Sequence, residues 1–218
     1  MELLADPDSD VRRTAAEALG KVGHKSSNAS LIVALDDPDG HVREAAAFAL
    51  GRLGDGKSGM ALAGHLADSA EPVQMASALA LGEIEFSAKS ETLILGGLRH
   101  PQRSARIAAT RALLSLDTVS LSAELIKALR DPDASVRQGV AAVLGETGNP
   151  GAVSHLRSLL GTDGEANVRV EAAFRLGKLG DSGVLAELSR AAEADPDMRV
   201  RGWAQWARQQ ITLSHEFG

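Results

Sequence analysis

The sequence predicts an all-α protein, a solenoid of about seven two-helix repeats of which the first is incomplete. The first observation is a fixed period, since one local pattern returns every 31 or 32 residues. The second is the helical spacing of small and apolar residues within each copy, and the third is a pair of helix start and stop signals around them. A period of this length is typical of stacked-repeat architectures. The same place in the pattern is held by Val11, Val42, Val73, Ala105, Val136, Val168 and Val200.

The second helix of each repeat, called the signature helix below, is clearest between Asp37 and Gly54. Counted from the recurrent valine as position zero, small or apolar residues stand at positions 4, 7, 8 and 11. At about 100° per residue these positions fall on one stripe of a helix, so the stripe is predicted to be buried. The preceding Asp-Pro-Asp supplies a capping carboxylate and a proline suited to the first turn, and the closing glycine permits a left-handed cap.

A leucine-rich segment precedes each Asp-Pro-Asp, and its spacing predicts a first, leading helix in each repeat. We expect these helices at Leu31–Leu35, Met60–Ala67, Thr92–Leu98, Ala123–Leu129, Val153–Leu160 and Val184–Ala191. The links between helices are short, as helical hairpins require. The chain is therefore predicted to be a single domain, 1–218, with repeats at about 1–23, 24–54, 55–86, 87–117, 118–148, 149–180 and 181–213 and a tail at 214–218.

The two ends of the array depart from the pattern in opposite ways. Only Glu2–Ala5 precedes the first Asp-Pro-Asp, so the first repeat lacks most of its leading helix. The resulting apolar edge is expected to be covered by a partner, by a second copy or by more of a longer chain. In the last repeat Gln205, Arg208 and Gln209 replace small or apolar residues, which is typical of a capping repeat with a polar outer face.

Composition excludes several classes of function. The net charge is −6 and no block of like charge stands out, which argues against a nucleic-acid partner because such a protein needs a basic patch. No stretch approaches the ~20 apolar residues of a membrane span. The absence of cysteine excludes disulfides and thiolate chemistry, and together with the lack of a secretory leader it predicts a cytoplasmic protein.

No catalytic or metal-binding constellation stands out in the sequence. The six histidines occupy unrelated repeat positions, and no two lie four residues apart as a helical metal site requires. The glycine-rich string from Gly54 to Gly59 lacks the spacing of a phosphate-binding loop and is expected to be a turn. We therefore expect a non-catalytic protein without a metal or cofactor.

The string Val-Arg-x-x-Ala-Ala-x-Ala-Leu-Gly-x-Leu-Gly after Asp-Pro-Asp resembles the short HEAT-like repeats named after phycobilisome lyases, over nearly the whole chain. The resemblance implies a HEAT/armadillo-type α-α superhelix with the signature helices on its concave side. It also implies that the arginine at position 1 and the aspartate six residues earlier pair along the stack, in a structural rather than a binding role. These residues are Asp6/Arg12, Asp37/Arg43, Asp131/Arg137, Asp163/Arg169 and Asp195/Arg201, while Gln74 and His100 interrupt the series.

The helix face opposite the buried stripe is the candidate binding surface. Positions 2, 6 and 9 lie there and vary in character from repeat to repeat. Their apolar members predict a groove, with Arg13, Arg111 and Arg175 placed to meet a carboxylate, and the glycines at position 9 suit either close ligand approach or close helix packing. An alternative is that neighbouring helices bury these side chains. The groove residues are Phe48, Met75, Leu79, Ile107, Arg111, Leu114, Val170, Phe174 and Trp206.

Two functions fit this surface. The first is a non-catalytic scaffold that binds a protein or peptide partner in the apolar groove. The second follows from the resemblance: a subunit of an E/F-type phycobilin lyase, which would hold a bilin, a linear tetrapyrrole, for transfer to a phycobiliprotein cysteine. A related di-iron deoxyhypusine hydroxylase would need repeated His-Glu pairs, whereas the chain has one, His215-Glu216. A HEAT-like DNA glycosylase is disfavoured by the acidic net charge.

Overall fold

The computed structural model confirms the predicted all-α fold. It describes residues 2–84, 88–114, 116, 122–148 and 150–217, except the side chains of 88–90 and 215–217, and this part of the chain contains helices and turns but no strand. The chain divides into two compact units, unit 1 (Met1–Asp117) and unit 2 (Thr118–Gly218), which are described separately. The division coincides with the predicted boundary between the fourth and fifth repeats.

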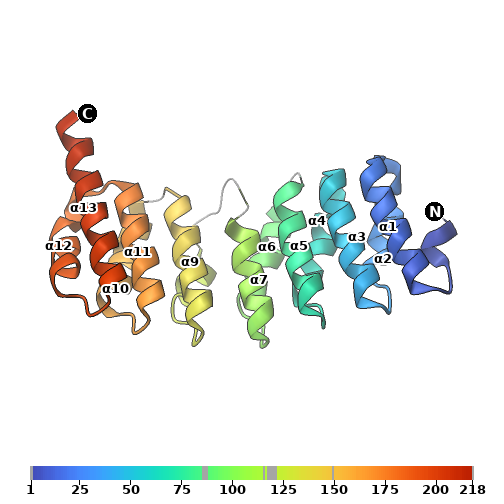
Figure 1. Cartoon of the computed structure of the whole chain (residues 1–218), viewed down its shortest axis with the longest axis horizontal. Coiled ribbons are helices and arrows are strands. Elements are labelled where there is room, and N and C mark those ends of the chain that lie inside the picture. The colour runs from blue at the N-terminus through green and yellow to red at the C-terminus, as the bar shows by residue number, and fades with distance from the viewer. Residues whose placement is uncertain (1, 85–87, 115, 117–121, 149, 218) are drawn as a thin grey trace. The chain divides into compact units, whose positions relative to one another are not determined.

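Unit 1 consists of two layers of helices. Its signature helices are α1 (Ser9–Val22), α3 (Gly40–Leu53), α5 (Glu71–Glu83) and α7 (Arg103–Leu114), which lie side by side in chain order (Figure 1). The leading helices α2 (Asn28–Ala34), α4 (Gly59–Gly64) and α6 (Ala88–Gly97) pack behind them, each on the signature helix of its own repeat. Short 3-10 turns complete the unit: η1 (Glu2–Ala5), η2 (Lys25–Ser27), η3 (Gly56–Ser58) and η4 (His65–Ala67).

Unit 2 repeats this arrangement. Its signature helices are α9 (Ala134–Glu146), α11 (Ala166–Leu179) and α13 (Met198–Phe217). Its leading helices are α8 (Ala123–Ala128), α10 (Pro150–Thr162) and α12 (Leu185–Ala194), with the 3-10 turn η5 (Ser182–Val184) before the last. The predicted leading helices are therefore all present, with small differences at their ends.

The helix ends form as their sequences predict. The second aspartate of Asp-Pro-Asp caps α3, where the Asp39 carboxylate accepts a hydrogen bond from the His41 amide at 2.8 Å, and Asp8 and Asp133 do the same for α1 and α9. At the other end the chain turns into the left-handed region at Gly54, with φ of 62°. Only glycine reaches this conformation without strain, so the terminal glycine fixes where the helix stops.

The buried stripe lies where the periodicity places it. In the second repeat Val42, Ala46 and Leu50 are fully buried, and the same positions are buried in most other repeats. The first repeat differs, because only η1 lies where a leading helix would otherwise pack. Its Val11 is half-buried and Val22 is exposed, so the predicted apolar edge is present.

Glycine at position 9 brings neighbouring signature helices into close contact. A Cβ on Gly51 would lie 2.9 Å from Ala80 Cα and 3.0 Å from Ala80 Cβ on the next helix, and one on Gly20 would lie 2.8 Å from the same atoms of Ala49. Real Cβ atoms do not approach backbone atoms so closely, so the helices would have to separate. The glycines at these positions therefore serve helix packing, and they do not open the backbone to a ligand.

Arginine–aspartate bridges connect successive repeats. Arg12 Nη1 donates to the backbone carbonyls of Asp6 and Pro7 in its own repeat, at 2.8 and 3.1 Å. Its Nε and Nη2 donate to the two carboxylate oxygens of Asp37 in the next repeat, at 2.7 and 2.9 Å. The arginine side chains are 10–15% exposed and the aspartates 5–8%. The pairs with this geometry are Arg12–Asp37, Arg43–Asp68, Arg137–Asp163 and Arg169–Asp195.

These bridges lower the pKa of the aspartates. The hydrogen bond from Arg12 holds the pKa of Asp37 below its ordinary value. Burial raises the pKa of Asp68, but the hydrogen bonds from Arg43 and the Ala70 amide, together with the charges of Arg43 and His65, lower it by more, so the pKa lies below its ordinary value. The carboxylates therefore stabilise the folded state fully above about pH 4, the pKa of an unfolded aspartate, and this contribution is lost as the pH falls through the lower folded-state pKa.

The junction between the third and fourth repeats lacks such a bridge, because Gln74 stands at the arginine position and His100 at the aspartate position. Gln74 Nε2 donates to the Asp68 carbonyl at 2.6 Å, as the arginines do, but its Oε1 is buried without a hydrogen-bond partner in the described structure. His100 Nδ1 accepts from the Gln102 amide at 3.2 Å, which keeps the turn that aspartate makes elsewhere. The turn is thus retained while the bridge is lost.

The first prediction concerns the helix contact. Gly51→Ala is expected to lower the free energy of unfolding by about 1–3 kcal/mol, because the added methyl group overpacks the contact with Ala80. Gly202→Ala is the matched control, since nothing lies within 4 Å of a Cβ there, and it is expected to raise the free energy of unfolding by about 0.5–1 kcal/mol. Urea denaturation measures both, and equal signs would contradict the packing role.

The second prediction concerns the missing bridge. Gln74→Arg combined with His100→Asp is expected to raise the free energy of unfolding by about 1 kcal/mol through a new bidentate pair. Either change alone should not stabilise, since it leaves a charge without its partner, so a double-mutant cycle isolates the gain. Urea denaturation at pH 7 and pH 3 is the measurement, and the gain should shrink at the lower pH as the new aspartate becomes protonated. Additive effects at pH 7 would show that no bridge forms.

Candidate functional site

The outward face of the signature helices in unit 1 carries exposed apolar side chains. Phe48 on α3 is 43% exposed and Leu79 on α5 is 51% exposed, and both stand at position 6 of their repeats. Met75 and Ile107, at position 2, are half-buried. Arg111 on α7 donates from Nη1 to Met75 Sδ at 2.7 Å, so these two predicted residues are in direct contact across adjacent helices.

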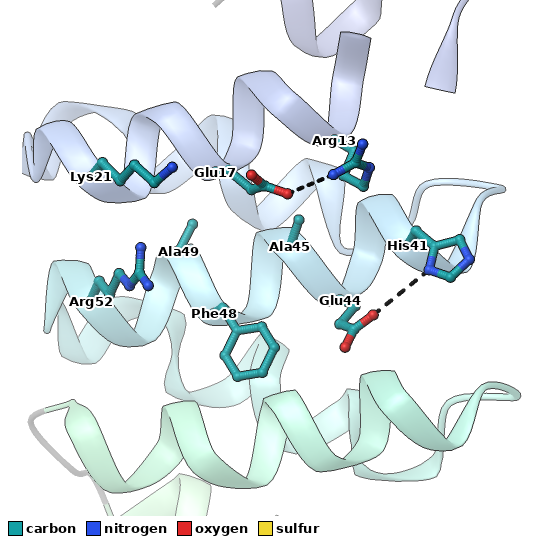
Figure 2. Close-up of a pocket in the computed structure, with 9 residues that line it drawn as sticks. All are labelled: Arg13, Glu17, Lys21, His41, Glu44, Ala45, Phe48, Ala49 and Arg52. Atoms are coloured by element: carbon teal, nitrogen blue, oxygen red, sulfur yellow. Dashed lines mark hydrogen bonds and ion pairs between the residues drawn. The ribbon is translucent and has the colours of Figure 1, made fainter. Parts of the chain in front are cut away.

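A surface cavity of about 750 Å³ lies along this face between α1 and α3. Its lining combines charged side chains from both helices with one aromatic ring and two alanines (Figure 2). Along the helices, Lys21 and Arg52 lie toward one end of the lining and His41 toward the other, while the Phe48 ring lies between these ends on the side of α3 away from α1 (Figure 2). The lining residues are Arg13, Glu17, Lys21, His41, Glu44, Ala45, Phe48, Ala49 and Arg52.

The charges at the two ends of the cavity differ. At one end Arg13 donates to Glu17 at 2.8 Å and to Asp10 at 3.2 Å, and these hydrogen bonds raise the pKa of Arg13. His41 lies 3.8 Å from Glu44 at the same end. At the other end, Lys21 and Arg52 are exposed and have no ion-pair or hydrogen-bond partner among the described residues. The cavity therefore has one end where the carboxylates of Glu17 and Glu44 outnumber the guanidinium of Arg13, and one positive end.

Unit 2 carries an aromatic cluster on the corresponding face. The rings of Phe174 on α11 and Trp206 on α13 stack with centroids 5.4 Å apart, and Trp203 packs edge-on against both at 5.2 and 5.4 Å. A Cβ on Gly177 would lie 2.7 Å from a ring atom of Trp206, so this glycine makes room for the indole. Trp203 is 39% exposed, which leaves part of the cluster open to solvent.

Arg175 makes its described contacts within unit 2. Its guanidinium forms ion pairs with Glu171, at 2.7 Å, and with Glu146. The Cζ atom of the guanidinium lies 5.2 Å from the centre of the Phe174 ring. The aliphatic part of the side chain lies across Gly145, because this position lacks a side chain. Arg175 is therefore engaged in contacts within unit 2, and the expectation that it meets a ligand carboxylate stays a prediction. Arg13 is occupied in the same way in unit 1.

Position 10, rather than position 9, continues the exposed face. The glycines at position 9 turn toward the next helix, whereas Lys21 and Arg52 at position 10 line the cavity. Sequence reasoning missed these two cations because it counted 2, 6 and 9 as one face. The available signal was their i,i+4 spacing from Glu17 and Phe48, which places them one turn further along the same side of each helix.

The nine predicted groove residues thus fall into two groups. Val170, Phe174 and Trp206 belong to unit 2, and the other six belong to unit 1, where Leu114 is half-buried. That one concave groove joins both groups stays a prediction. The same applies to their role in binding a partner.

The described residues contain neither a candidate metal site nor a helix that could cross a membrane. They contain no group of three or more histidine, aspartate or glutamate side chains that could hold a metal ion. The side chains of His215 and Glu216, the one His-Glu pair, lie outside the described part of the structure. Within that part, no helix combines the length and the apolar character needed to cross a membrane.

Comparisons with known proteins agree with the repeat pattern. A family model described as HEAT repeats matches residues 1–82, 90–175 and 122–209. No curated protein sequence matches the chain.

The solved structures that are similar to this one include the following three. The archaeal HEAT-like repeats protein from Thermococcus onnurineus NA1 aligns at a TM-score of 0.62 and 16% identity over 97% of this chain and 95% of that one. The complex of CpcE and CpcF of phycocyanin lyase from Nostoc sp. PCC7120 aligns at a TM-score of 0.53 and 23% identity, over 99% of this chain and 86% of that one. Human deoxyhypusine hydroxylase aligns at a TM-score of 0.51 and 24% identity, over 96% of this chain and 82% of that one. At these identities the likenesses concern the fold alone.

The third prediction tests whether Phe48 and Leu79 lie on an exposed face or belong to the core. Phe48→Asp with Leu79→Asp is expected to leave the helical content and the melting temperature nearly unchanged, because both side chains are about half exposed. Leu50→Asp is the contrasting variant, and it is expected to unfold the protein because it places a charge at a fully buried site. Circular dichroism measures both. If the double variant also unfolds, Phe48 and Leu79 belong to the core and the candidate site is wrong.

Proposed function

Because the chain belongs to the HEAT-repeat family, we propose that it is a non-catalytic scaffold which binds a protein or peptide partner on the exposed face of its unit 1 signature helices. The observation that carries the proposal is the exposure of Phe48 and Leu79 on adjacent helices, next to the cavity between α1 and α3. Apolar side chains gathered on a surface are typical of a site that another molecule covers.

Packing within the chain does not account for these side chains. Position 6 holds Glu17 on α1 and Arg111 on α7, so the repeat tolerates a charge there without losing its helix contacts. Phe48 and Leu79 therefore expose apolar area that the fold does not require. A partner that buries this area gains about 25 cal/mol for each Å² removed from water, which gives the two residues a use in binding.

A bilin is the second candidate for the same face. Its specific support is the position of Lys21 and Arg52 beside Phe48, since a linear tetrapyrrole combines an apolar body with two propionates. The likeness to the CpcE and CpcF complex concerns the fold alone, so it does not favour this ligand over a peptide. We rank it second because the exposed apolar residues continue onto α5, beyond the cavity.

The fourth prediction tests the binding face. The immobilised protein is expected to enrich binders from a phage-displayed library of random peptides, and Phe48→Asp with Leu79→Asp should weaken their binding at least tenfold. The matched control is Val33→Asp with Met60→Asp, which changes two exposed apolar residues of the same unit on its leading helices and should leave binding unchanged. Fluorescence anisotropy with labelled peptides measures the affinities.

Two results would contradict the proposal. One is the absence of any enriched peptide, and the other is a set of peptides that bind both double variants equally. A parallel titration with biliverdin, followed by visible absorption and circular dichroism, tests the second candidate. A spectral change that is lost in the Phe48→Asp and Leu79→Asp variant, without peptide enrichment, would assign the face to a tetrapyrrole.

A further inference from the structure

Helix packing and the helix dipole do not explain why Lys21 and Arg52 lie together at the positive end of the cavity. Lys21 and Arg52 stand in the last turns of α1 and α3, where a cation interacts favourably with the partial negative charge of the helix terminus. That effect explains a cation near a helix end, but it does not require one at this position. Glu83 on α5 and Glu146 on α9 occupy the same repeat position, so the repeat also accepts a carboxylate there.

Within the described part of the chain, no side chain forms an ion pair with either cation. Every other charged side chain lining the cavity has a partner nearby, since Arg13 pairs with Glu17 and His41 lies beside Glu44. Glu83 follows on the next helix, yet no ion pair joins it to Arg52 in the described structure. Two like charges at one end of a cavity repel each other and raise the local positive potential, which attracts an anion.

The cations lie beside the apolar anchor. Phe48 and Arg52 are four residues apart on α3, so their Cβ atoms are about 6 Å apart, although the Phe48 ring then extends away from α1 and the Arg52 guanidinium does not (Figure 2). Lys21 faces the same space from α1 (Figure 2). A ligand that places an apolar group against Phe48 therefore has a cation within one helical turn of that group.

Resting on the proposed function, we infer that the partner is an acidic peptide segment, with a bulky apolar residue seated against Phe48 and an aspartate or glutamate held between Lys21 and Arg52. The spacing of about 6 Å matches neighbours three or four apart on a helix, and it also matches residues two apart on an extended chain. At the other end of the cavity the carboxylates of Glu17 and Glu44 outnumber the guanidinium of Arg13, so the selectivity for an acidic segment comes from Lys21 and Arg52.

The test compares charge reversal at the cavity with the same change elsewhere. A peptide enriched by the wild-type protein is labelled with fluorescein and titrated against Lys21→Glu with Arg52→Glu. The control is Lys25→Glu with Lys57→Glu, which changes the net charge equally at exposed sites of η2 and η3 that do not line the cavity. Circular dichroism verifies that both variants keep their helical content.

We expect the enriched peptides to pair aspartate or glutamate with phenylalanine, tryptophan or leucine. Reversal at Lys21 and Arg52 should weaken their binding at least tenfold, and the control should change it less than threefold. Replacing the acidic residue of the peptide by its amide should cause a similar loss. Binding to the wild type should also weaken as sodium chloride rises from 50 to 500 mM, because salt screens exposed charges.

The outcomes separate this inference from the function on which it rests. Suppose that the binding of the enriched peptides requires Phe48 and Leu79, but that the peptides lack acidic residues or bind the charge-reversal variant as well as the wild type. This result would contradict the acidic partner while leaving the scaffold function in place. No enriched peptide at all, or binding that ignores Phe48 and Leu79, would overturn the scaffold itself. Biliverdin binding that is lost on charge reversal, with no peptide enriched, would replace the peptide by a tetrapyrrole and overturn both.

Discussion

The arginine at position 1 is the side chain on which the stacking of this chain depends. Its guanidinium holds the Asp-Pro carbonyls of its own repeat with one nitrogen and the carboxylate of the next repeat with the other two. A planar, bidentate group does this better than a lysine could, because both ends of the contact are fixed in direction. One residue thereby sets both the turn before a helix and the position of the following repeat. The bridges are mostly buried, so losing one partner would leave a desolvated charge.

Close packing of the signature helices decides which residues remain outside. Since Gly20 and Gly51 let alanines of the next helix approach their backbone, position 9 is used for contact and the outward side is left to positions 2, 6 and 10. The residues that pack neighbouring signature helices together are small and similar from repeat to repeat. The side chains at the outward positions, in contrast, vary between charged, aromatic and aliphatic types. A scaffold of this kind can alter its surface without altering its stack, and this separation is why Phe48 and the two cations are informative about a partner.

The repeat pattern predicted the fold because each level of the sequence agreed with the others: period, helical spacing, caps and stops. It also placed Phe48 and Leu79 on the helix face opposite the buried stripe, which follows from the periodicity of one helix alone, but it left open whether neighbouring helices bury them; both are exposed. It failed where the outcome depends on how one helix is rotated against the next. The cations Lys21 and Arg52 were missed for this reason, and so were the glutamate partners of Arg175, one of which comes from another repeat. Local spacing cannot determine such contacts.

The aromatic cluster of unit 2 has a practical consequence for spectroscopy. The chain contains two tryptophans and no tyrosine, and both indoles lie on α13 in contact with Phe174. Intrinsic fluorescence excited at the red edge of the indole band therefore reports on unit 2 alone, while circular dichroism reports on the helices of both units. The wild-type protein thus carries its own label for one half of the chain, and comparing the two signals reveals whether the halves melt together or one after the other.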